Sequence, residues 1–331
     1  LRVDRQRQKT CRGGDAIGGH TGERRGRVFR EGWGGGGRGG ARVALRPARR
    51  IHADRYLQTR DTSLVIRWLV KQTPDFPRVF KDKREFHAWC ARHTLPAVSA
   101  LAQFENGRPL GDVPELPATD LFSKPANAQG GFGARRWTYI GAGRYAGMDG
   151  RTYTTDDLQA ALARLSTDLG HPIVLQRMLR NANAIAGLSP GGLCTARVVT
   201  MRAPGTEPRL LLAVYRMPTA SAVADNFDQG GLAAPIELAT GRLGLAVRKD
   251  PKLLAEPIAS HPDTGMRIEG QLLPYWSEAV SLVLRAHAAV WWRGVPFIGW
   301  DVALLDEGPV LLEGNNVPCS TLAQMPSGIP L

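Results

Sequence analysis

The chain has 331 residues and a formal net charge of +13, and it is long enough to form one large domain or two to three lobes. Residues 1–60 contain 16 of the 43 Lys and Arg residues but 5 of the 30 Asp and Glu residues, whereas the remainder contains 27 basic and 25 acidic residues. Because the body of the chain is nearly neutral, its composition argues against a nucleic-acid-binding domain.

The positive charge belongs to an Arg- and Gly-rich segment at residues 1–50, which includes four consecutive glycines from Gly34. Such a composition cannot offset the entropy of ordering, so we expect a disordered tail. An Arg/Gly tail can bind RNA or an anionic membrane surface through phosphate contacts. Because the chain begins with Leu rather than Met, the segment can instead be the edge of a fragment or a misassigned start, and we do not favour nucleic acid as a partner.

The cysteines indicate a reduced compartment. They are widely spaced and include no C-x-x-C pair, which argues against a zinc site or a disulfide framework: Cys11, Cys90, Cys194 and Cys319. A cytoplasmic location is therefore expected. The chain also lacks a run of 18 or more apolar residues and the apolar region of a signal peptide, so we expect no transmembrane segment. Its oligomeric state is not indicated.

In the first half of the chain, apolar periodicity and turn residues predict a series of helices and strands. In order they are a short helix within residues 51–74, a helix at 81–92, a turn leading into a strand at 94–103, a Pro- and Gly-rich connector at 107–117, a strand at 120–124, a Gly-rich loop at 126–133, a strand at 136–140, a helix at 155–169 and a strand at 172–176. The helix at 155–169 is expected to begin at an N-cap formed by Thr154 or Thr155.

The second half is expected to be richer in strands. Its elements are β-rich stretches at 194–202 and 209–216, a Gly-rich loop at 225–233, a long helix at 277–292 and strands at 300–305 and 309–313. Helices mixed with antiparallel strands predict α+β lobes rather than a doubly wound parallel sheet. We divide the chain into the tail at 1–50, a helical segment with the start of the first lobe at 51–110, the rest of the first lobe at 111–180, and a second lobe at 181–331.

The last two strands are expected to form a hairpin through a three-residue loop at 306–308, with Gly in the left-handed last position. In that register Leu305 lies opposite Pro309, and Asp301 falls opposite Glu313. Side chains alternate along a strand, so Asn315 is expected on the same face as Glu313.

Asp301, Glu313 and Asn315 would then gather three oxygen ligands at one end of an otherwise apolar hairpin. Adjacent carboxylates repel and are costly to desolvate unless a cation lies between them. A Mg²⁺ ion, held by one or two carboxylates and completed by substrate phosphates, would fit this arrangement. The alternative is a half-exposed hairpin whose acids are solvated, and we favour the metal.

Two lysines and a glycine-rich loop are candidates for phosphate binding. Lys124 ends a strand and is followed by Gly130, Gly131 and Gly133, an arrangement that can place a cation and backbone N–H groups around a polyphosphate. The loop matches neither a Walker A motif nor a dinucleotide-binding fingerprint. Lys83, at the start of the helix at 81–92, is a second candidate, and its alternative is a solvated surface charge.

Arg197 and Arg216 lie within, or at the end of, apolar strands, where each needs an anionic partner. A phosphate or acyl phosphate would serve, and so would a structural carboxylate such as Asp225 or Glu237; both remain open.

Other reactive side chains do not form a catalytic pattern. The histidines lack a ligand spacing, His287 is expected to be a satisfied core residue, and Cys194 lacks a neighbouring base and is expected to be inert packing. No G-x-S-x-G motif is present, which leaves an α/β-hydrolase unsupported.

Taken in order, these segments resemble the ATP-grasp superfamily. The residues that carry the resemblance are Asp82-Lys83 with the turn Leu95-Pro96 (the start of the first ATP-binding lobe), Lys124 with Gly130 to Gly133 (the second lysine and the phosphate-covering loop), residues 174–179 (the hinge strand beside adenine), and Asp301, Glu313 and Asn315 (the metal-binding D…E-x-N signature).

Within the superfamily, the chain is most similar to the sugar-transfer-associated ATP-grasp group found with polysaccharide biosynthesis. This likeness rests on residues 175–177 and 188–200, on Arg216 with residues 225–235, on Thr240-Gly241 and on the Gly-Trp-Asp sequence at 299–301. It covers roughly residues 80–331 and leaves the tail unexplained. Gln176 stands where many relatives have Glu.

The resemblance implies an ATP-grasp fold, in which two α+β lobes clasp ATP and Mg²⁺, and an ADP-forming ligase. A carboxylate would attack the γ-phosphate to form an acyl phosphate, from which an amine-type nucleophile, such as one from a glycan precursor, would displace phosphate. The implied roles are α/β-phosphate binding by Lys83 and Lys124, loop closure by Gly130, Gly131 and Gly133, adenine contact by Gln176 and Leu179, stabilisation of the transferring group by Arg197 and Arg216, and metal binding by Asp301, Glu313 and Asn315.

Two other functions stay open at this point. The same ATP site could serve a kinase that phosphorylates a sugar or polyol, because a hydroxyl acceptor needs no change in the ATP site. The protein could also act as an RNA- or membrane-binding protein through the Arg/Gly tail.

Overall fold

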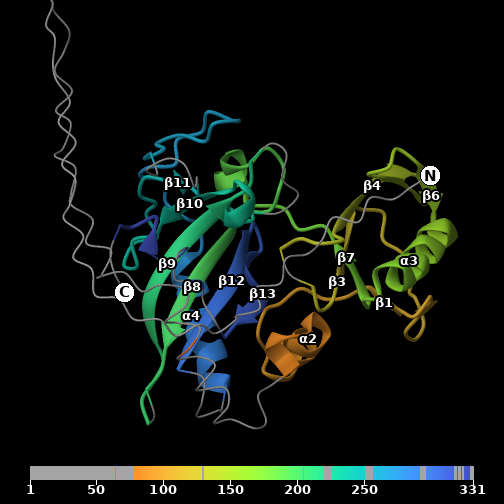
Figure 1. The fold of residues 1–331 in the computed structure, drawn as a ribbon, viewed down its shortest axis with the longest axis horizontal. Coiled ribbons are helices and arrows are strands. Elements are labelled where there is room, and N and C mark those ends of the chain that lie inside the picture. Colours follow the sequence, from red (N-terminus) through yellow and green to blue (C-terminus); the bar gives the residue numbers. More distant parts are fainter. Residues whose placement is uncertain are drawn as a thin grey trace, which may run out of the picture. The chain divides into compact units, whose positions relative to one another are not determined.

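The computed structural model of the protein describes residues 78–128, 130–203, 205–219, 225–249, 256–290 and 296–316, together with residues 64, 319, 322 and 324–328. Figure 1 draws the described residues as coloured ribbon. The tail predicted at residues 1–50 lies outside the described residues, as does all but one residue of the helix predicted within 51–74.

Residues 102–177 form a seven-stranded sheet with the order β2-β1-β7-β3-β4-β5-β6. All neighbouring strands of this sheet pair antiparallel. The strand that comes last in the sequence, β7, lies between β1 and β3. The strands are β1 (Ala102–Glu105), β2 (Arg108–Pro109), β3 (Leu121–Pro125), β4 (Arg135–Gly141), β5 (Arg144–Gly147), β6 (Thr152–Thr154) and β7 (Ile173–Arg177).

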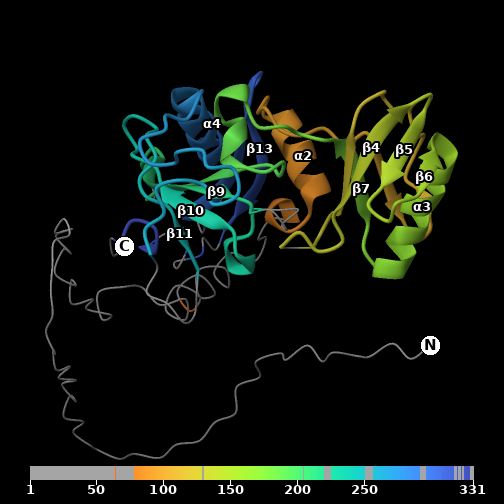
Figure 2. The same cartoon turned by 90° about the horizontal axis from the view of Figure 1, so that it is seen from above.

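One helix, α3 (Thr155–Leu169), covers this sheet (Figure 2). It begins at a capping box in which the Thr154 hydroxyl accepts from the backbone of Asp157 and the Asp157 carboxylate accepts from the backbone of Thr154, which confirms Thr154 as the N-cap. Leu158 and Leu162 recur at the helical spacing and are fully buried in the core of this lobe.

The two faces of the sheet have different roles, because successive side chains of a strand point to opposite faces. On β3, Leu121 belongs to the core beneath α3, and Ser123 accepts a hydrogen bond from the Trp137 indole of the same core. Phe122 and Lys124 therefore lie on the other face, away from α3.

Residues 195–315 supply a second, six-stranded antiparallel sheet with the order β11-β10-β9-β8-β12-β13. Its strands are β8 (Thr195–Met201), β9 (Arg209–Met217), β10 (Leu232–Pro235), β11 (Val247–Arg248), β12 (Phe297–Leu305) and β13 (Gly308–Asn315). Helices α2 (Lys83–Arg92) and α4 (Trp276–Ala289) contribute to its core, and short 3₁₀ helices lie at Arg78–Phe80, Asn183–Leu188 and Phe227–Gln229. The mixture confirms the predicted α+β class.

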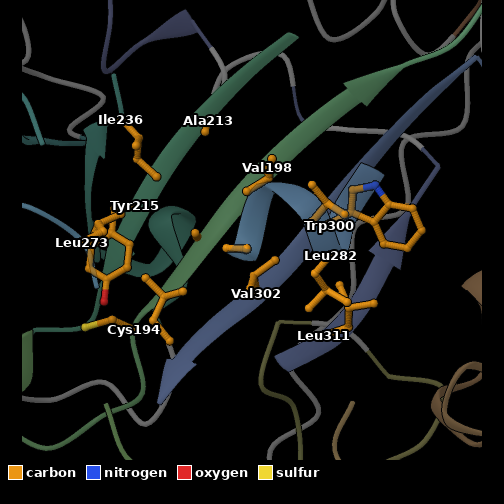
Figure 3. Packing of buried hydrophobic residues seen from close by; sticks show 14 of the residues in the cluster. Cys194, Val198, Ala213, Tyr215, Ile236, Leu273, Leu282, Trp300, Val302 and Leu311 are labelled. Atoms are coloured by element: carbon orange, nitrogen blue, oxygen red, sulfur yellow. The ribbon is translucent and has the colours of Figure 1, made fainter. Parts of the chain in front are cut away.

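The core of the second lobe centres on β12. Trp300, Val302 and Leu311 pack with Leu282 of α4 (Figure 3). The Trp300 ring stacks on Trp89 of α2, with ring centroids 6.3 Å apart. The apolar side of β12 is thus anchored by two helices, and the alternate residues, including Asp301, lie on the opposite face.

The β12–β13 hairpin differs from the predicted register at its turn. The loop has two residues, 306 and 307, and Leu305 pairs with Gly308 rather than Pro309. A β-bulge between Asp301 and Val302 inserts one extra residue on β13 and restores the predicted pairing of Asp301 with Glu313. The three-residue loop was therefore wrong, and the pairing of the two acids is confirmed.

Residues 94–103 were predicted to form a turn leading into a strand, and that order is confirmed, but the strand begins later than expected, because β1 spans Ala102–Glu105. Leu95 and Val98 are buried without belonging to a strand, and burial rather than strand pairing explains their apolar character. The helix predicted to end at 292 ends at Ala289, where Val290 has extended backbone.

Candidate active site

Most of the predicted site residues line one cavity of about 540 Å³. It is bounded by side chains of both sheets, of α2 and of the glycine-rich loop. The predicted residues among its lining are Lys83, Lys124, Gly130, Gly131, Arg197, Arg216, Asp301, Glu313 and Asn315. Residues separated by more than 200 positions in the sequence thus line one cavity.

A buried ion-pair network forms one side of the cavity. Asp301 on β12 is the register partner of Arg197 on β8, so their side chains share a face. The Arg197 Nε–H donates to Asp301 Oδ1, and its Nη2–H donates to Oδ2 at 3.0 Å. Arg216 Nη2 lies 2.9 Å from Asp301 Oδ2. Burial acts to raise the pKa of Asp301, but the charges of Arg197 and Arg216 outweigh it and hold that pKa well below its usual range.

A second carboxylate, Asp225, completes this network. The Thr195 hydroxyl donates to Asp225 Oδ2, and Arg216 Nε donates to Thr195 Oγ1 at 3.0 Å and lies 3.4 Å from Asp225 Oδ2. Burial raises the pKa of Asp225, although the Arg216 charge acts against it. Of the two carboxylates considered for the strand arginines, Asp225 is the partner of Arg216, whereas Glu237 accepts a hydrogen bond from Thr240.

The sequence indicates Asp225 only as a possible structural partner of an arginine and gives no reason to single out Thr195 as a site residue. Both line the cavity. Their signal in the sequence was weak, because a Thr at the start of a strand and an Asp in a glycine-rich loop are common surface residues. Only the pairing of β8 with β9, which makes Thr195 the register partner of Arg216, brings them together.

The two lysines have different surroundings. Lys83 Nζ donates to the carbonyl of Ala128 at 2.8 Å, and it lies 3.8 Å from Glu313 Oε2. Lys124 is on the β3 face that lines the cavity. Burial and the charge of Lys83 lower the pKa of Lys124 to about 8, against the opposing charges of Glu313 and Asp301. An anion bound beside Lys124 would therefore stabilise the charged form of this amine.

The glycine-rich loop requires its glycines. Gly130, Gly131 and Gly133 have φ of +67°, +76° and +68°, in the left-handed region that side chains disfavour. A Cβ at Gly133 would also lie 2.7 Å from Leu169 Cδ1. Gly130 and Gly131 line the cavity of about 540 Å³. Gly133 does not line it and instead packs against α3.

A smaller cavity of about 150 Å³ adjoins the first, since both are lined by Phe122, Lys124 and Thr195. It contains the predicted adenine residues Gln176 and Leu179. The Gln176 Oε1 atom is buried and accepts no hydrogen bond within the described residues. A buried amide oxygen without a partner is costly, so a ligand that donates an N–H here would be favoured.

The smaller cavity also contains a residue that the sequence did not reveal. Arg136 lies on β4 opposite Phe122, on the face turned away from α3. Because β4 also carries exposed residues, an Arg within it is not distinguished in the sequence from a solvated surface arginine.

The proposed magnesium ligands are adjacent but unequal. The Asn315 amide donates to Glu313 Oε1 at 3.2 Å, which confirms their shared face. Asp301 already accepts two N–H groups of Arg197 and lies 2.9 Å from Arg216 Nη2, and a carboxylate offers about four lone-pair sites. Across the described residues, no group of three or more His, Cys, Asp and Glu side chains is placed to hold a metal. Two carboxylates and an amide still fit an ion whose coordination is completed by phosphate oxygens.

The remaining expectations concern inert side chains and membranes. His287 is buried and hydrogen-bonds Thr200 Oγ1 at 2.7 Å, which confirms a satisfied core histidine. Cys194 is buried, and burial raises the pKa of its thiol, as expected for inert packing. In the part of the chain that the structure describes, no helix is both long and apolar enough to cross a membrane.

Three crystal structures of ligases show limited similarity to this chain. PurK, N5-carboxyaminoimidazole ribonucleotide synthetase, in complex with ADP, shares 10% identity with a TM-score of 0.43 over 80% of this chain and 52% of its own. D-alanyl-alanine synthetase A from Vibrio cholerae shares 12% identity with a TM-score of 0.40 over 74% and 57%. An L-amino acid ligase from Bacillus licheniformis shares 12% identity with a TM-score of 0.40 over 73% and 42%.

This chain thus spans about half the length of those structures. No curated protein matches it in sequence. The family comparison is decisive, because residues 71–331 match the family described as sugar-transfer associated ATP-grasp. The resemblance inferred from the motifs is therefore confirmed, and the chain belongs to the sugar-transfer-associated ATP-grasp family.

Proposed function

We propose that this protein is an ATP- and Mg²⁺-dependent, ADP-forming ligase that joins a carboxylate to an amine-type nucleophile through an acyl phosphate. We further propose a role in polysaccharide or cell-surface glycan biosynthesis, in keeping with the family's description. The observation that carries the proposal is the convergence of two lysines, two arginines and the Asp301–Glu313 pair on one cavity.

The adjoining cavities suit the two ends of a nucleotide. The smaller one, with Gln176 and Leu179, would take adenine, whose exocyclic amine can donate to the unpartnered Gln176 Oε1. The larger one would take the phosphates between Lys124 and the backbone of Gly130 and Gly131. Lys83 now donates to loop carbonyls, so it would both hold the loop and offer charge to the phosphates.

Glu313 and Asn315 would be the principal magnesium ligands, with Asp301 contributing a lone pair that accepts no hydrogen bond from Arg197. When bound, magnesium would neutralise charge on the β- and γ-phosphates. In the free protein Glu313 faces Lys83 at 3.8 Å, a distance that gives only a weak ion pair at a half-exposed site. The side chain is thus available to a cation at little cost.

Arg197 and Arg216 would stabilise the negative charge that develops on the transferring phosphoryl group. Each is held in place by Asp301, and each retains an Nη1 group that forms no hydrogen bond within the described residues. Donors fixed before the reaction need no rearrangement when charge develops, which favours catalysis. No side-chain nucleophile is required, because positioning and electrostatic stabilisation account for phosphoryl transfer.

The test measures ADP release by the full-length protein with panels of carboxylic acids and amines, including glycan precursors. A ligase releases ADP and phosphate only when a suitable acid and an amine are both present. Hydroxylamine in place of the amine should trap the acyl phosphate as a hydroxamate, and Glu313→Gln should abolish both signals. A stable phosphorylated sugar or polyol formed without an acid would instead establish a kinase and refute the ligase.

Deleting residues 1–50, which lie outside the described residues, distinguishes a ligase from an RNA- or membrane-binding protein that acts through its Arg/Gly tail. A ligase retains its ATP turnover after the deletion. Loss of all activity together with loss of RNA or vesicle binding would instead support a protein that acts through its Arg/Gly tail.

A further inference from the structure

We propose that the seven-stranded lobe carries a second ligand site, separate from the nucleotide cavity, that binds a small molecule with two or more phosphate or carboxylate groups. The site is a pocket of about 340 Å³ between α3 and the strands β4 and β6. We call it the arginine pocket. It is defined by Arg135, Trp137, Arg151, Tyr153, Arg164 and Asp168.

Three separate segments each contribute one guanidinium to the arginine pocket. Arg135 is the first residue of β4, Arg151 directly precedes β6, and Arg164 lies on α3. The three are exposed, and the one acid of the pocket, Asp168, lies 3.7 Å from Arg164. Three cations against one carboxylate leave the pocket with a net positive charge.

Arg135 and Arg151 have no carboxylate within ion-pairing distance in the described part of the chain. The nearby Asp149 accepts from the Tyr153 hydroxyl at 2.6 Å and from the Arg151 backbone at 3.1 Å. Its hydrogen bond to Tyr153 raises the pKa of that phenol, and the charges of Arg151 and Arg135 act in the opposite direction. Both arginines and Tyr153 line the same pocket.

The floor of the arginine pocket is aromatic and held in place. Trp137 is 3% exposed, and its ring meets Tyr153 edge to face with centroids 5.3 Å apart. Its indole N–H donates to Ser123 Oγ at 3.0 Å, which fixes the ring. On the facing turn of α3, Ala160 and Ala161 leave the space open. A hollow with an apolar floor and a cationic rim suits a compact organic anion.

The arginine pocket and the nucleotide cavities lie on opposite faces of the same sheet. Arg135 and Trp137 line the arginine pocket, whereas Arg136, between them on β4, lines the smaller nucleotide cavity. On β3, Ser123 supports the pocket floor and Lys124 lines the nucleotide cavity. Because alternate side chains point to opposite faces, one nucleotide cannot occupy both sites.

The exposure of the three arginines indicates how many acidic groups the ligand carries. A single pair between exposed charges contributes little, about 0–1 kcal/mol, so one acidic group would not be retained. A ligand with two or more such groups can engage two or three guanidinium groups at once, each through paired N–H donors. Phosphate and carboxylate share this chemistry, and the experiment separates them.

The test is calorimetric titration of the full-length protein at low ionic strength with inorganic pyrophosphate and with glucuronic acid 1-phosphate. A Lys124→Ala background weakens phosphate binding in the nucleotide cavity, so the remaining binding reports the arginine pocket. Arg151→Ala should then weaken binding about threefold to fivefold, as expected for the loss of one exposed charge pair of up to about 1 kcal/mol. Arg144→Ala, which removes an exposed arginine of β5 outside the pocket, should change the affinity less than about twofold.

Binding of pyrophosphate alone would support a phosphate ligand, and tighter binding of the sugar acid would support one with a carboxylate. No binding of either probe would overturn the proposal, and so would equal losses in Arg151→Ala and Arg144→Ala. Arg135→Ala provides a second test if Arg151→Ala fails to fold, because Arg135 lies on β4 and Arg151 lies outside that strand, directly before β6. Glucose, which has the ring without the charge, should not bind.

Discussion

Replacing Asp301 by Asn should destabilise the fold far more than replacing Glu313 by Gln, although both residues are proposed metal ligands. Asp301 is 4% exposed and balances the buried guanidinium groups of Arg197 and Arg216. Asn keeps the shape and removes the charge, so two arginines remain with Asp225 as their one buried carboxylate. Breaking a buried ion pair by neutralising one partner costs about 3–5 kcal/mol, and we expect a loss in that range.

The Glu313 carboxylate gives the matched control. Its side chain is 35% exposed, and its ion-pair partner, Lys83, lies 3.8 Å away. Pairs of this kind contribute about 0–1 kcal/mol, so Glu313→Gln should unfold close to the wild type. Both variants remove one negative charge from the same face of one hairpin, and the difference between them isolates the buried network.

The assay is urea unfolding followed by tryptophan fluorescence, with Mg²⁺-dependent ATP turnover measured on the same preparations. With an m-value of about 3 kcal/mol/M, the Asp301→Asn midpoint should fall by about 1 M or more, and the Glu313→Gln midpoint by less than about 0.3 M. Glu313→Gln should nevertheless lose Mg²⁺-dependent turnover. An Asp301→Asn loss below about 1 kcal/mol would refute the ion-pair argument, and unchanged turnover in both variants would refute the metal assignment.

Three further predictions concern protonation and the loop. Because the pKa of Lys124 is lowered to about 8, ADP affinity measured by calorimetry should weaken up to about tenfold per pH unit above pH 8, as the amine loses its proton, and Lys124→Arg should flatten that dependence. Burial and the charge of Lys124 lower the pKa of His87 to about 4. The unfolded chain therefore binds this proton more readily, and stability in urea should fall by up to about 3 kcal/mol between pH 6.5 and pH 4, a fall that His87→Phe should reduce. Gly133→Ala should lower the thermal midpoint more than Gly143→Ala, because both positions have φ near +67° but only at Gly133 would the new Cβ meet other atoms.

The sequence was most informative where the chemistry is local to one hairpin. The pairing of Asp301 with Glu313 was predicted from strand alternation, although the predicted loop was one residue too long. The extra residue of the bulge compensated for that error. A bulge depends on how a strand packs against its neighbours, so no pattern within the hairpin reveals it.

The partners of the strand arginines could not be predicted, because they come from distant parts of the chain. Arg197 and Asp301 are 104 positions apart, and they meet only because β8 lies beside β12 in the sheet. Alternation within each strand shows that an arginine faces inward, but it does not show which strand lies next to it. The sequence therefore indicated the need for an anion without deciding between a phosphate and a carboxylate.

The two arginines of the cavity and Lys124 have different electrostatic surroundings. Arg197 and Arg216 are already paired with carboxylates. They would therefore stabilise a phosphate mainly because their N–H donors are fixed in position, and not because the arginines lack an ionic partner. Lys124 is the opposite case, because burial and the charge of Lys83 lower its pKa to about 8, so a bound anion would stabilise its positive form. Nucleotide binding energy should therefore depend mainly on Lys124, and the rate of phosphoryl transfer mainly on the arginines. Lys124→Ala should raise the Kd for ADP, whereas Arg216→Lys, which keeps the charge but loses the fixed fork of donors, should lower kcat with a smaller change in Kd. Equal effects of both variants on Kd would show that the arginines also serve as ground-state phosphate ligands.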